Sequence, residues 1–405
     1  MSETRVPRGS RVRLGTLGGD LRVEANTHVD VDGRLIVPGE ARFDGRSEVG
    51  GDLECRTLRC EDGTVRVRGT LLVHEEIRGE DAILEVEGEL RAQDVDIDRG
   101  LRVGGPIHGR NLEIGGYLEG RSTLDATRVS AGGKVRLAGK LTADKVEAGG
   151  SIDIADVDLA SLEAGGLVHI RGGAVRERIK VGGRFVAEGP TRFGSLEAGG
   201  FAEFRGDATG GSVDVGGFFT ARGNLAFTSL EAGGFGTIEG DAQGDSVEVG
   251  GRFQVRGSLT LTGSLEVGGS ISVGKELAAG SLELGGKLTA LLAKFQSEAE
   301  IGGVVETDLG LKAPRITLER RSRASGPLVG GQILLKERAR AEDIYGESVE
   351  LRSHASARRI IATRVRLGER SSASEIVYTD ALEREESATV STPEQKVSQL
   401  PSFPL

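Results

Sequence analysis

The sequence repeats a pair of adjacent glycines at nearly constant intervals between Glu147 and Gly303. The interval of about 17 residues is shorter than the roughly 33–47 residues that repeats built from pairs of helices need. It is long enough for three short strands and three corners. The spacing therefore predicts a β-solenoid in which each repeat forms one coil. The pairs open at Gly149, Gly165, Gly182, Gly199, Gly216, Gly233, Gly250, Gly268, Gly285 and Gly302.

The residues between the glycine pairs alternate between apolar and polar, as strands with one buried side do. The segment from Ser246 to Gly263 divides into SVEVGG, RFQVRG and SLTLTG, and each piece shows this alternation. Glycine within a strand destabilises it by roughly 0.5–1 kcal/mol relative to alanine, so a pair in every coil needs a physical reason. The expected reason is a corner with positive φ or a close approach of the backbone to the next coil.

The second and fourth residues after each glycine pair are predicted to point inward. A large residue in one coil falls opposite a small residue in the next, and the order then reverses. Because protein interiors are close-packed, this alternation indicates side chains that interdigitate between stacked coils. It also explains why the sequence repeats more closely over two coils than over one. The successive pairs are Phe185 and Ala187, Ala202 and Phe204, Phe219 and Ala221, Gly236 and Ile238, Phe253 and Val255.

Four segments are expected. Residues 1–10 form a flexible N-terminal tail, and residues 11–312 form a Gly-rich β-solenoid. Residues 313–390 form an Ala/Ser/Arg-rich solenoid of 16-residue coils, in which Lys and Arg outnumber Asp and Glu by 14 to 7 between Lys312 and Arg370. Residues 391–405 form a Pro-containing C-terminal tail. Residues 11–390 would make roughly 22 coils, each in contact only with its neighbours.

Composition and charge limit the functional classes. A net charge of -10 argues against general nucleic-acid binding. The polar start of the chain predicts no signal peptide, and no apolar run is long enough to span a membrane. Cys55 and Cys60 are too few for a disulfide framework. These features predict a cytoplasmic location, and attachment to the inner face of the cell membrane is a further option. The basic residues Arg5, Arg8, Arg11 and Arg13 are either a membrane-contacting arm or a solvated terminus.

The segment VELRSHASARRIIATRVRLGERSSASEIVYT, from Val349 to Thr379, resembles the bactofilins, a family of polymer-forming cytoskeletal proteins. The VEVGG and LEVGG steps of the Gly-rich region are similar to them in a more general way. The resemblance covers residues 11–390 as a repeat pattern. It implies a right-handed parallel β-helix that assembles end to end into filaments without nucleotide, through apolar terminal coils flanked by flexible tails.

Two outward ladders are predicted. The first residue after the glycine pair is Phe in three successive coils, Phe201, Phe218 and Phe235, which either stack on one another or form a stripe for lateral bundling or a partner. The residue two before each pair is acidic in nine of ten coils. This acidic ladder is either a solubility face or a surface for divalent cations or for the basic segment of another copy.

Catalytic chemistry is not predicted. The five histidines, His28, His74, His108, His169 and His354, fall on different coils, and no catalytic, nucleotide-binding or zinc-binding motif appears. We therefore expect no catalytic residue, no cofactor and no metal ligand. A polysaccharide-active β-helix enzyme is the weakest alternative, and its acids would be Asp214 and Glu231.

The sequence predicts a self-assembling structural protein whose partner is another copy of itself, because open solenoid ends recruit other chains. The alternative is a monomeric binding scaffold that uses the Phe residues, and lateral bundling or a cytoskeletal or membrane partner is also open. The C-terminal residues Leu400, Phe403 and Leu405 either dock in a groove or belong to an idle tail. The expected polymerisation surfaces are Leu14, Leu17, Leu21 and Val23 at one end, and Ile376, Val377, Tyr378 and Leu382 at the other.

Overall fold

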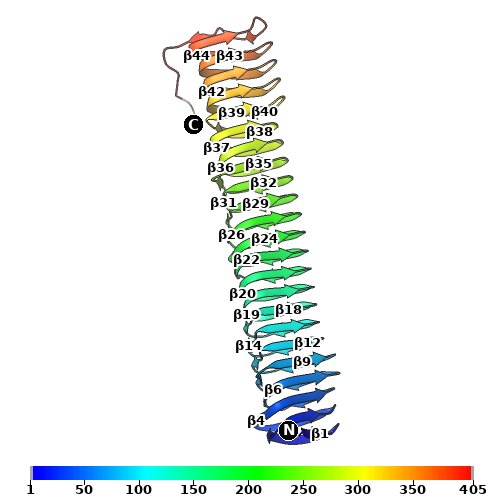
Figure 1. The fold of residues 1–405 in the computed structure, drawn as a ribbon. Coiled ribbons are helices and arrows are strands. Elements are labelled where there is room, and N and C mark those ends of the chain that lie inside the picture. Colours follow the sequence, from blue (N-terminus) through cyan, green and yellow to red (C-terminus); the bar gives the residue numbers. More distant parts are fainter. Residues whose placement is uncertain (1–2, 403–405) are drawn as a thin grey trace. The chain divides into compact units, whose positions relative to one another are not determined.

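The computed structural model describes residues 3–402, which form strands and no helix. The chain divides into two compact units, residues 1–200 and residues 201–405. In each unit, short parallel strands stack coil upon coil (Figure 1). The prediction of an all-β solenoid is confirmed, with about 23 turns at intervals of ~17 residues.

Unit 1 contains the first 24 strands, and the longer ones continue around a corner of the coil. They are β1 (Glu3–Val6), β2 (Arg11–Thr16), β3 (Asp20–Val23), β4 (Thr27–Asp44), β5 (Ser47–Val49), β6 (Asp52–Glu61), β7 (Thr64–Val67), β8 (Leu71–Val73), β9 (Glu76–Glu80), β10 (Ile83–Val86), β11 (Leu90–Arg91), β12 (Asp94–Ile97), β13 (Gly100–Val103), β14 (Ile107–His108), β15 (Asn111–Ile114), β16 (Tyr117–Gly120), β17 (Leu124–Asp125), β18 (Arg128–Ala131), β19 (Lys134–Ala148), β20 (Ser151–Ala164), β21 (Leu167–Ile170), β22 (Gly173–Val181), β23 (Arg184–Ala187) and β24 (Thr191–Ala198).

Unit 2 contains the remaining strands. They are β25 (Phe201–Phe204), β26 (Ala208–Val215), β27 (Phe218–Ala221), β28 (Leu225–Ala226), β29 (Ser229–Ala232), β30 (Phe235–Ile238), β31 (Ala242–Gly244), β32 (Ser246–Val249), β33 (Arg252–Val255), β34 (Leu259–Leu261), β35 (Ser264–Val267), β36 (Ser270–Leu284), β37 (Lys287–Ile301), β38 (Val304–Lys312), β39 (Arg315–Leu318), β40 (Arg323–Ser325), β41 (Leu328–Leu335), β42 (Arg340–Leu351), β43 (Ser356–Leu367), β44 (Ser372–Arg384), β45 (Thr389–Val390) and β46 (Gln395–Lys396).

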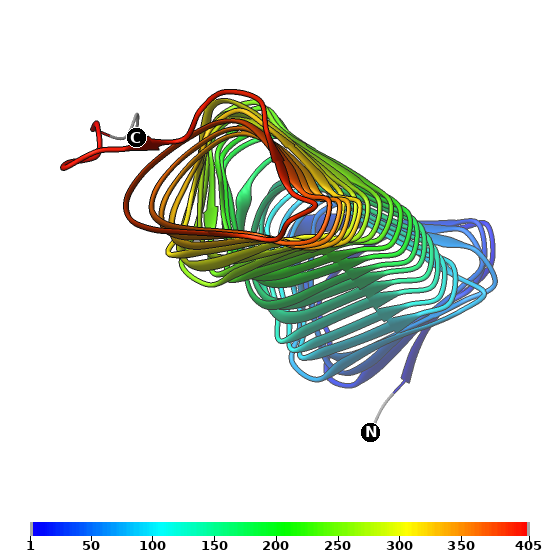
Figure 2. The same ribbon diagram turned by 90° about the horizontal axis from the view of Figure 1, so that it is seen from above.

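Seen end-on, the coils have a rounded triangular outline, and each coil contributes one rung to each of three parallel sheets (Figure 2). The first face contains β9, β12 and β15 in unit 1 and β29, β32 and β35 in unit 2. The second face follows the glycine pair and contains β10, β13 and β16, and β27, β30 and β33. The third face contains β8, β11 and β14, and β28, β31 and β34.

The predicted alternation of large and small residues fills the core of the second face. In unit 2, Phe219 lies in register with Gly236, and Gly236 lies in register with Phe253. Both rings are buried, and a Cβ atom on Gly236 would lie 2.3 Å from the ring of Phe253. The inward positions are thus confirmed, and Gly236 provides the space that the large ring occupies.

The glycine pairs allow close approach between coils. A Cβ atom on Gly166 would lie 2.5 Å from the carbonyl oxygen of Gly150 in the preceding coil, and neither residue has a positive φ. Of the two reasons expected from the sequence, close approach therefore applies at this corner. Any side chain there would separate the backbones of adjacent coils.

A different corner joins the first and second faces in the C-terminal coils. Arg321, Arg338, His354 and Arg370 have φ of 63°, 60°, 58° and 51°, in successive coils. A non-glycine residue in this left-handed region costs about 1–2 kcal/mol. The residue that follows each of them is Ser or Ala and is buried. These small side chains point into the core at the corner that the glycine pair occupies in the earlier coils.

Both expected tails contribute strands. β1 pairs with β3, so the solenoid begins at Glu3 rather than at residue 11. At the other end, β45 and β46 pair with β44, so the sheet continues into the predicted C-terminal tail. The expectation of two tails depends on Pro residues and polar composition, and neither prevents short strands at the edge of a sheet.

Candidate functional site

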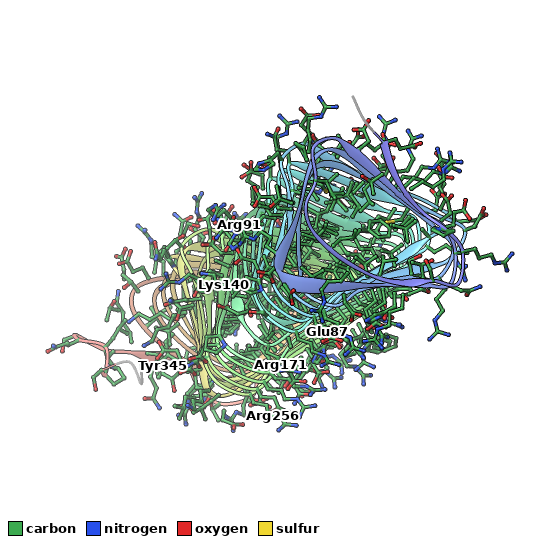
Figure 3. The ribbon with its side chains drawn as sticks, turned by 90° about the horizontal axis from the view of Figure 1, so that it is seen from below. Glu87, Arg91, Lys140, Arg171, Arg256 and Tyr345 are labelled. Atoms are coloured by element: carbon green, nitrogen blue, oxygen red, sulfur yellow. The ribbon has the colours of Figure 1, made fainter. Side chains whose placement is uncertain are left out.

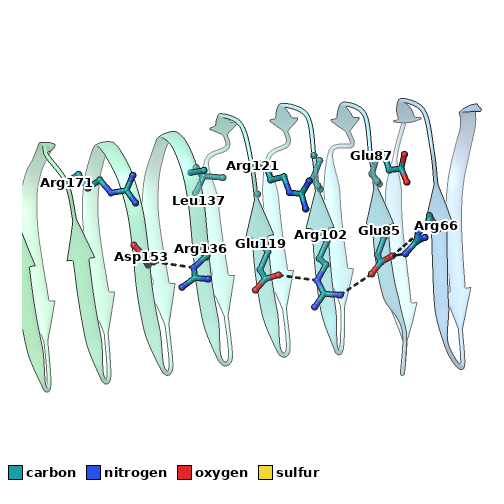
Figure 4. Close-up of a pocket in the computed structure, with 15 residues that line it drawn as sticks. Arg66, Glu85, Glu87, Arg102, Glu119, Arg121, Arg136, Leu137, Asp153 and Arg171 are labelled. Atoms are coloured by element: carbon teal, nitrogen blue, oxygen red, sulfur yellow. Dashed lines mark hydrogen bonds and ion pairs between the residues drawn. The ribbon is translucent and has the colours of Figure 1, made fainter.

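The second face of unit 1 is hollowed into an open groove with a volume of about 920 Å³ (Figure 4). A second hollow of about 650 Å³ shares Arg66 and Glu85 with it and continues toward Arg11 and His28. This groove was not predicted from the sequence. Its lining residues with charged side chains are Arg66, Glu85, Glu87, Arg102, Glu119, Arg121, Arg136, Asp153 and Arg171.

A row of charges of alternating sign runs along the groove, one residue per coil. We call it the charged row, and it consists of Arg66, Glu85, Arg102, Glu119, Arg136 and Asp153 (Figure 4). Arg102 bridges two acids, with Nη1 3.0 Å from Glu85 Oε1 and Nε 3.1 Å from Glu119 Oε2. Opposite charges on adjacent strands stabilise a sheet, whereas like charges destabilise it. The charged row therefore largely neutralises itself.

The electrostatics of Glu85 show the effect of this arrangement. Its partial burial opposes ionisation, but hydrogen bonds from Arg66 and Arg102 outweigh that effect and hold the pKa of the Glu85 carboxyl below its usual value. Arg102 also lies over the ring of Tyr117, 4.8 Å from its centroid. The middle of the groove is thus a network of fixed, ionised side chains.

Arg121 and Arg171 differ from the charged row because they form no ion pair within residues 3–402. Figure 4 shows both on the same side of the row, near the ends of their strands, and Figure 3 shows the polar side chains that surround the coils. Gly104 and Ala138 occupy the equivalent positions on neighbouring coils and leave the hollow between the long side chains. These two guanidinium groups are the part of the groove that is free to bind an anion.

The acidic ladder predicted from the sequence is continuous in unit 2. Its members lie in register on the first face, one per coil, as Asp214, Glu231, Glu248, Glu266, Glu283 and Glu300. Within the described part of the chain, none of them pairs with Lys or Arg. A hydrogen bond with Glu319 raises the pKa of the Glu300 carboxyl above its usual value. Asp214 and Glu231, the acids of the enzyme alternative, belong to this ladder and do not line the groove.

The predicted Phe ladder also forms. Phe201, Phe218 and Phe235 lie in register at the first position of the second face in unit 2. The rings of Phe218 and Phe235 stack with 5.5 Å between centroids and 11° between planes, and the two residues are 56% and 52% exposed. Phe201 is half-buried. The three residues therefore combine stacking on one another with an exposed apolar stripe.

At the N-terminal end, two of the four expected polymerisation residues are accessible. Leu14 and Leu17 are half-buried. Leu21 and Val23 are buried because β1 covers β3, which the expected flexible tail would not have done. Within the described residues, β1 and β2 each pair with one neighbour only, so their outer edges are open.

At the C-terminal end, the returning chain covers part of the expected surface. Ile376 is 0% exposed and Val377 is 8% exposed, because β45 and β46 lie against β44. Tyr378 is half-buried, and Lys396 Nζ lies 5.9 Å from its ring centroid. Leu382 is half-buried in the last segment of β44, whose outer edge has no partner among the described residues. Leu400 is half-buried, whereas Phe403 and Leu405 lie outside the described residues.

Cysteine and metal-ligand side chains add no further candidate site in the part of the chain that the structure describes. Cys55 and Cys60 are free and buried, and burial raises the pKa of the Cys55 thiol to about 12. Residues 3–402 contain no group of three or more His, Cys, Asp or Glu side chains that could hold a metal ion. Over the same residues, there is no helix long and apolar enough to cross a membrane.

Comparisons with models of protein families, with curated proteins and with solved structures found no match.

Proposed function

We propose that this protein is a structural protein whose copies stack end to end into filaments without nucleotide. The observation that carries the proposal is the open strand edge at each end of the chain. β1 and β2 have one partner each, and the segment Ala381–Arg384 of β44 has a partner on one side only. Such open edges are templates for pairing with another chain unless a helix, a loop or charged side chains block them.

The strands at the two ends belong to faces that complement each other. The first described turn begins on the first face with β1, and the last described turn ends on the third face with β46. The open segment Ala381–Arg384 lies on the first face. A second copy would therefore place its β1 as the next rung on that segment, its β2 next to β45, and the residues after β2 next to β46.

Apolar side chains at these ends would add to the backbone pairing. Leu14, Leu17 and Leu382 are half-buried in the single chain. Complete burial of a Leu side chain stabilises by about 1.5–3 kcal/mol relative to full exposure, so each of them would gain part of that amount on stacking. The proposal agrees with what the resemblance to bactofilins implies.

Negative-stain electron microscopy of Leu382→Arg and of the unaltered protein tests this proposal. The substitution puts a charge on the open segment of β44, and we expect short particles in place of filaments. Ser374→Arg is the matched control, since it adds the same charge at an exposed corner of the same strand. Filaments of equal length for Leu382→Arg, or an unaltered protein that stays monomeric at high concentration, would contradict end-to-end stacking.

A monomeric scaffold that binds an extended anionic chain is the second candidate, and the groove of unit 1 favours it. Arg121 and Arg171 are three coils apart, about 14 Å along the stack, and could hold two anionic groups of one chain. Binding of heparin at low and high salt tests this function. We expect the double change Arg121→Ser and Arg171→Ser to weaken binding at least tenfold, whereas Arg256→Ser in unit 2 leaves it unchanged.

A further inference from the structure

The second face changes character between the two units. In unit 1 it carries the charged row, whereas in unit 2 the equivalent outward positions carry no carboxylate over five successive coils. We call the first two of these coils the Phe–Thr strip, formed by Phe218, Thr220, Phe235 and Thr237. The next three coils have Arg252 and Gln254, Ser270 and Ser272, and Lys287 and Thr289 at these positions.

The strip exposes aromatic surface that the same strands could have buried. Phe219, the neighbour of Phe218, points into the core and is 2% exposed, whereas Phe218 is 56% exposed. The stacked pair of Phe218 and Phe235 leaves about 100 Å² of each ring side chain in water, from a total of roughly 200 Å² per Phe. Apolar surface that stays exposed in one contiguous patch is often functional, and the two stacked rings form such a patch.

The chemistry of the neighbouring faces identifies the occupant. Packing the strip against the acidic ladder would remove ionised carboxylates from water without giving them partners, which is unfavourable. Packing it against the charged row would also take ionised side chains out of water, and apolar rings offer no compensating contact. The strip of a second copy carries no acid and presents the same rings and threonines. A pair related by a two-fold axis brings a surface patch against itself, so one strip suffices for both partners.

The position of Arg252 sets the orientation. Arg252 follows Phe235 in register and makes no ion pair within residues 3–402. In a parallel pair with the strips aligned, the two Arg252 side chains would face each other and repel. In an antiparallel pair, Phe218 faces Phe235 of the second copy, and the two Arg252 side chains lie at opposite ends of the contact, where they do not face each other.

We propose that two copies of this chain pair laterally and antiparallel through the Phe–Thr strip. With one flanking coil on each side of the two-coil strip, the contact spans four coils, about 19 Å, and buries on the order of 250 Å² per copy, roughly a third of the ~800 Å² of a standard interface. A single pair is therefore weak, and the contact becomes strong where many copies are held in line. The pairing itself does not depend on end-to-end stacking.

Cysteine cross-linking detects such a weak contact. Thr220 of one copy faces Thr237 of the other in the antiparallel pair, and the native Cys55 and Cys60 are buried. We expect an equal mixture of Thr220→Cys and Thr237→Cys to form disulfide-linked dimers under copper–phenanthroline at least fivefold faster than Thr260→Cys. Thr260 points outward on the third face of unit 2 and serves as the control.

The ring contacts are tested in the same assay. Adding Phe218→Ser and Phe235→Ser to both cysteine variants should reduce cross-linking to the rate of the Thr260→Cys control, with an unchanged melting temperature because the rings are exposed. A mixture that reacts at the control rate, or one that the serines do not slow, overturns the proposal. Making the two cysteine variants in the Leu382→Arg protein separates lateral pairing from end-to-end stacking. We expect this protein to form no filaments, while the cross-link still forms.

Discussion

The rings of Phe218 and Phe235 stack 5.5 Å apart on the outside of adjacent coils, while Phe219, the residue next to Phe218, lies in the core. One strand, β27, therefore places two Phe side chains in opposite environments. The alternation of side chains along a strand is the cause, since successive residues point to opposite sides of the sheet.

This contrast predicts opposite effects of two adjacent alanine substitutions. Phe219→Ala should lower the free energy of unfolding by about 3–5 kcal/mol, because it leaves a cavity between coils. Phe218→Ala should change it by no more than about 0.5 kcal/mol, the usual range for an exposed side chain. Urea denaturation followed by circular dichroism measures both. Equal losses would mean that the outer ring stack also holds the coils together.

The glycine pairs predict a second effect. Gly166→Ala should destabilise unit 1 by about 1–3 kcal/mol, because its Cβ atom would lie 2.5 Å from the Gly150 carbonyl oxygen and force the coils apart. Gly18→Ala is the control, since no atom lies within 4 Å of a Cβ atom there. Thermal unfolding of the two variants gives the comparison, and a neutral Gly166→Ala would show that the corner can relax.

A third prediction concerns pH at the N-terminal edge. The hydrogen bond from Arg11 lowers the pKa of the Asp30 carboxyl to about 2. The Nε atom of Arg11 lies 2.6 Å from Asp30 Oδ2. Because this pKa is below that of an unfolded Asp, the stabilisation is complete above about pH 4 and is lost as the pH falls toward 2. Titration of the Asp30 carboxyl by NMR should give this low value.

The same contact joins β2 to β4, so Asp30→Asn should speed hydrogen exchange of the β2 amides at pH 7. Asp32→Asn should have a smaller effect, since Asp32 and Arg13 are 3.4 Å apart and both side chains are at least 70% exposed. If both variants exchange like the unaltered protein, the ion pair with Arg11 does not hold the edge.

A fourth prediction concerns Arg384. It lies in register with the buried Leu367, so it occupies an inward position of the last coil, and it pairs with Glu394 at 2.6 Å. An inward-pointing charge on an edge strand opposes pairing with another chain. Arg384→Leu should therefore lower the protein concentration at which filaments appear.

Sedimentation across a concentration series measures this threshold. Glu394→Gln is the companion variant, because it removes the ion pair but keeps the charge of Arg384, and it should not lower the threshold. A threshold that Arg384→Leu leaves unchanged would show that Arg384 does not limit stacking.

The sequence predicted the coils and their inward positions because the glycine pairs fix the register where the intervals are nearly constant. Phe219, Gly236 and Phe253 could be aligned on that basis alone. The same alignment placed Phe218 and Phe235 on the outside, as the structure confirms.

The groove was missed because its coils precede the regular array of glycine pairs. The step from Arg66 to Glu85 is longer than the four steps from Glu85 to Asp153, which are 17 residues each, so only the first rung of the charged row departs from one period. Which side chains align from coil to coil depends on the corner that accommodates the extra residues of the longer step. The alternation of sign from Arg66 to Asp153 was the available signal.

The ends of the chain were predicted less well for a different reason. Leu21, Val23, Ile376 and Val377 were expected to be exposed, and short strands from both expected tails bury them. These strands are two to four residues long and carry no repeat pattern. Periodicity cannot reveal an element that occurs once.

The reversal of large and small residues from coil to coil restricts how such a chain can change in length. Loss of the single coil from Phe218 to Gly234 would place the large residues Phe204 and Ile238 next to each other in the core. It would also place the small residues Ala202 and Gly236 next to each other. Loss of both coils from Phe201 to Gly234 would leave the order intact for the coils that follow. Insertions and deletions in this region should therefore be inherited as pairs of coils and never as single ones.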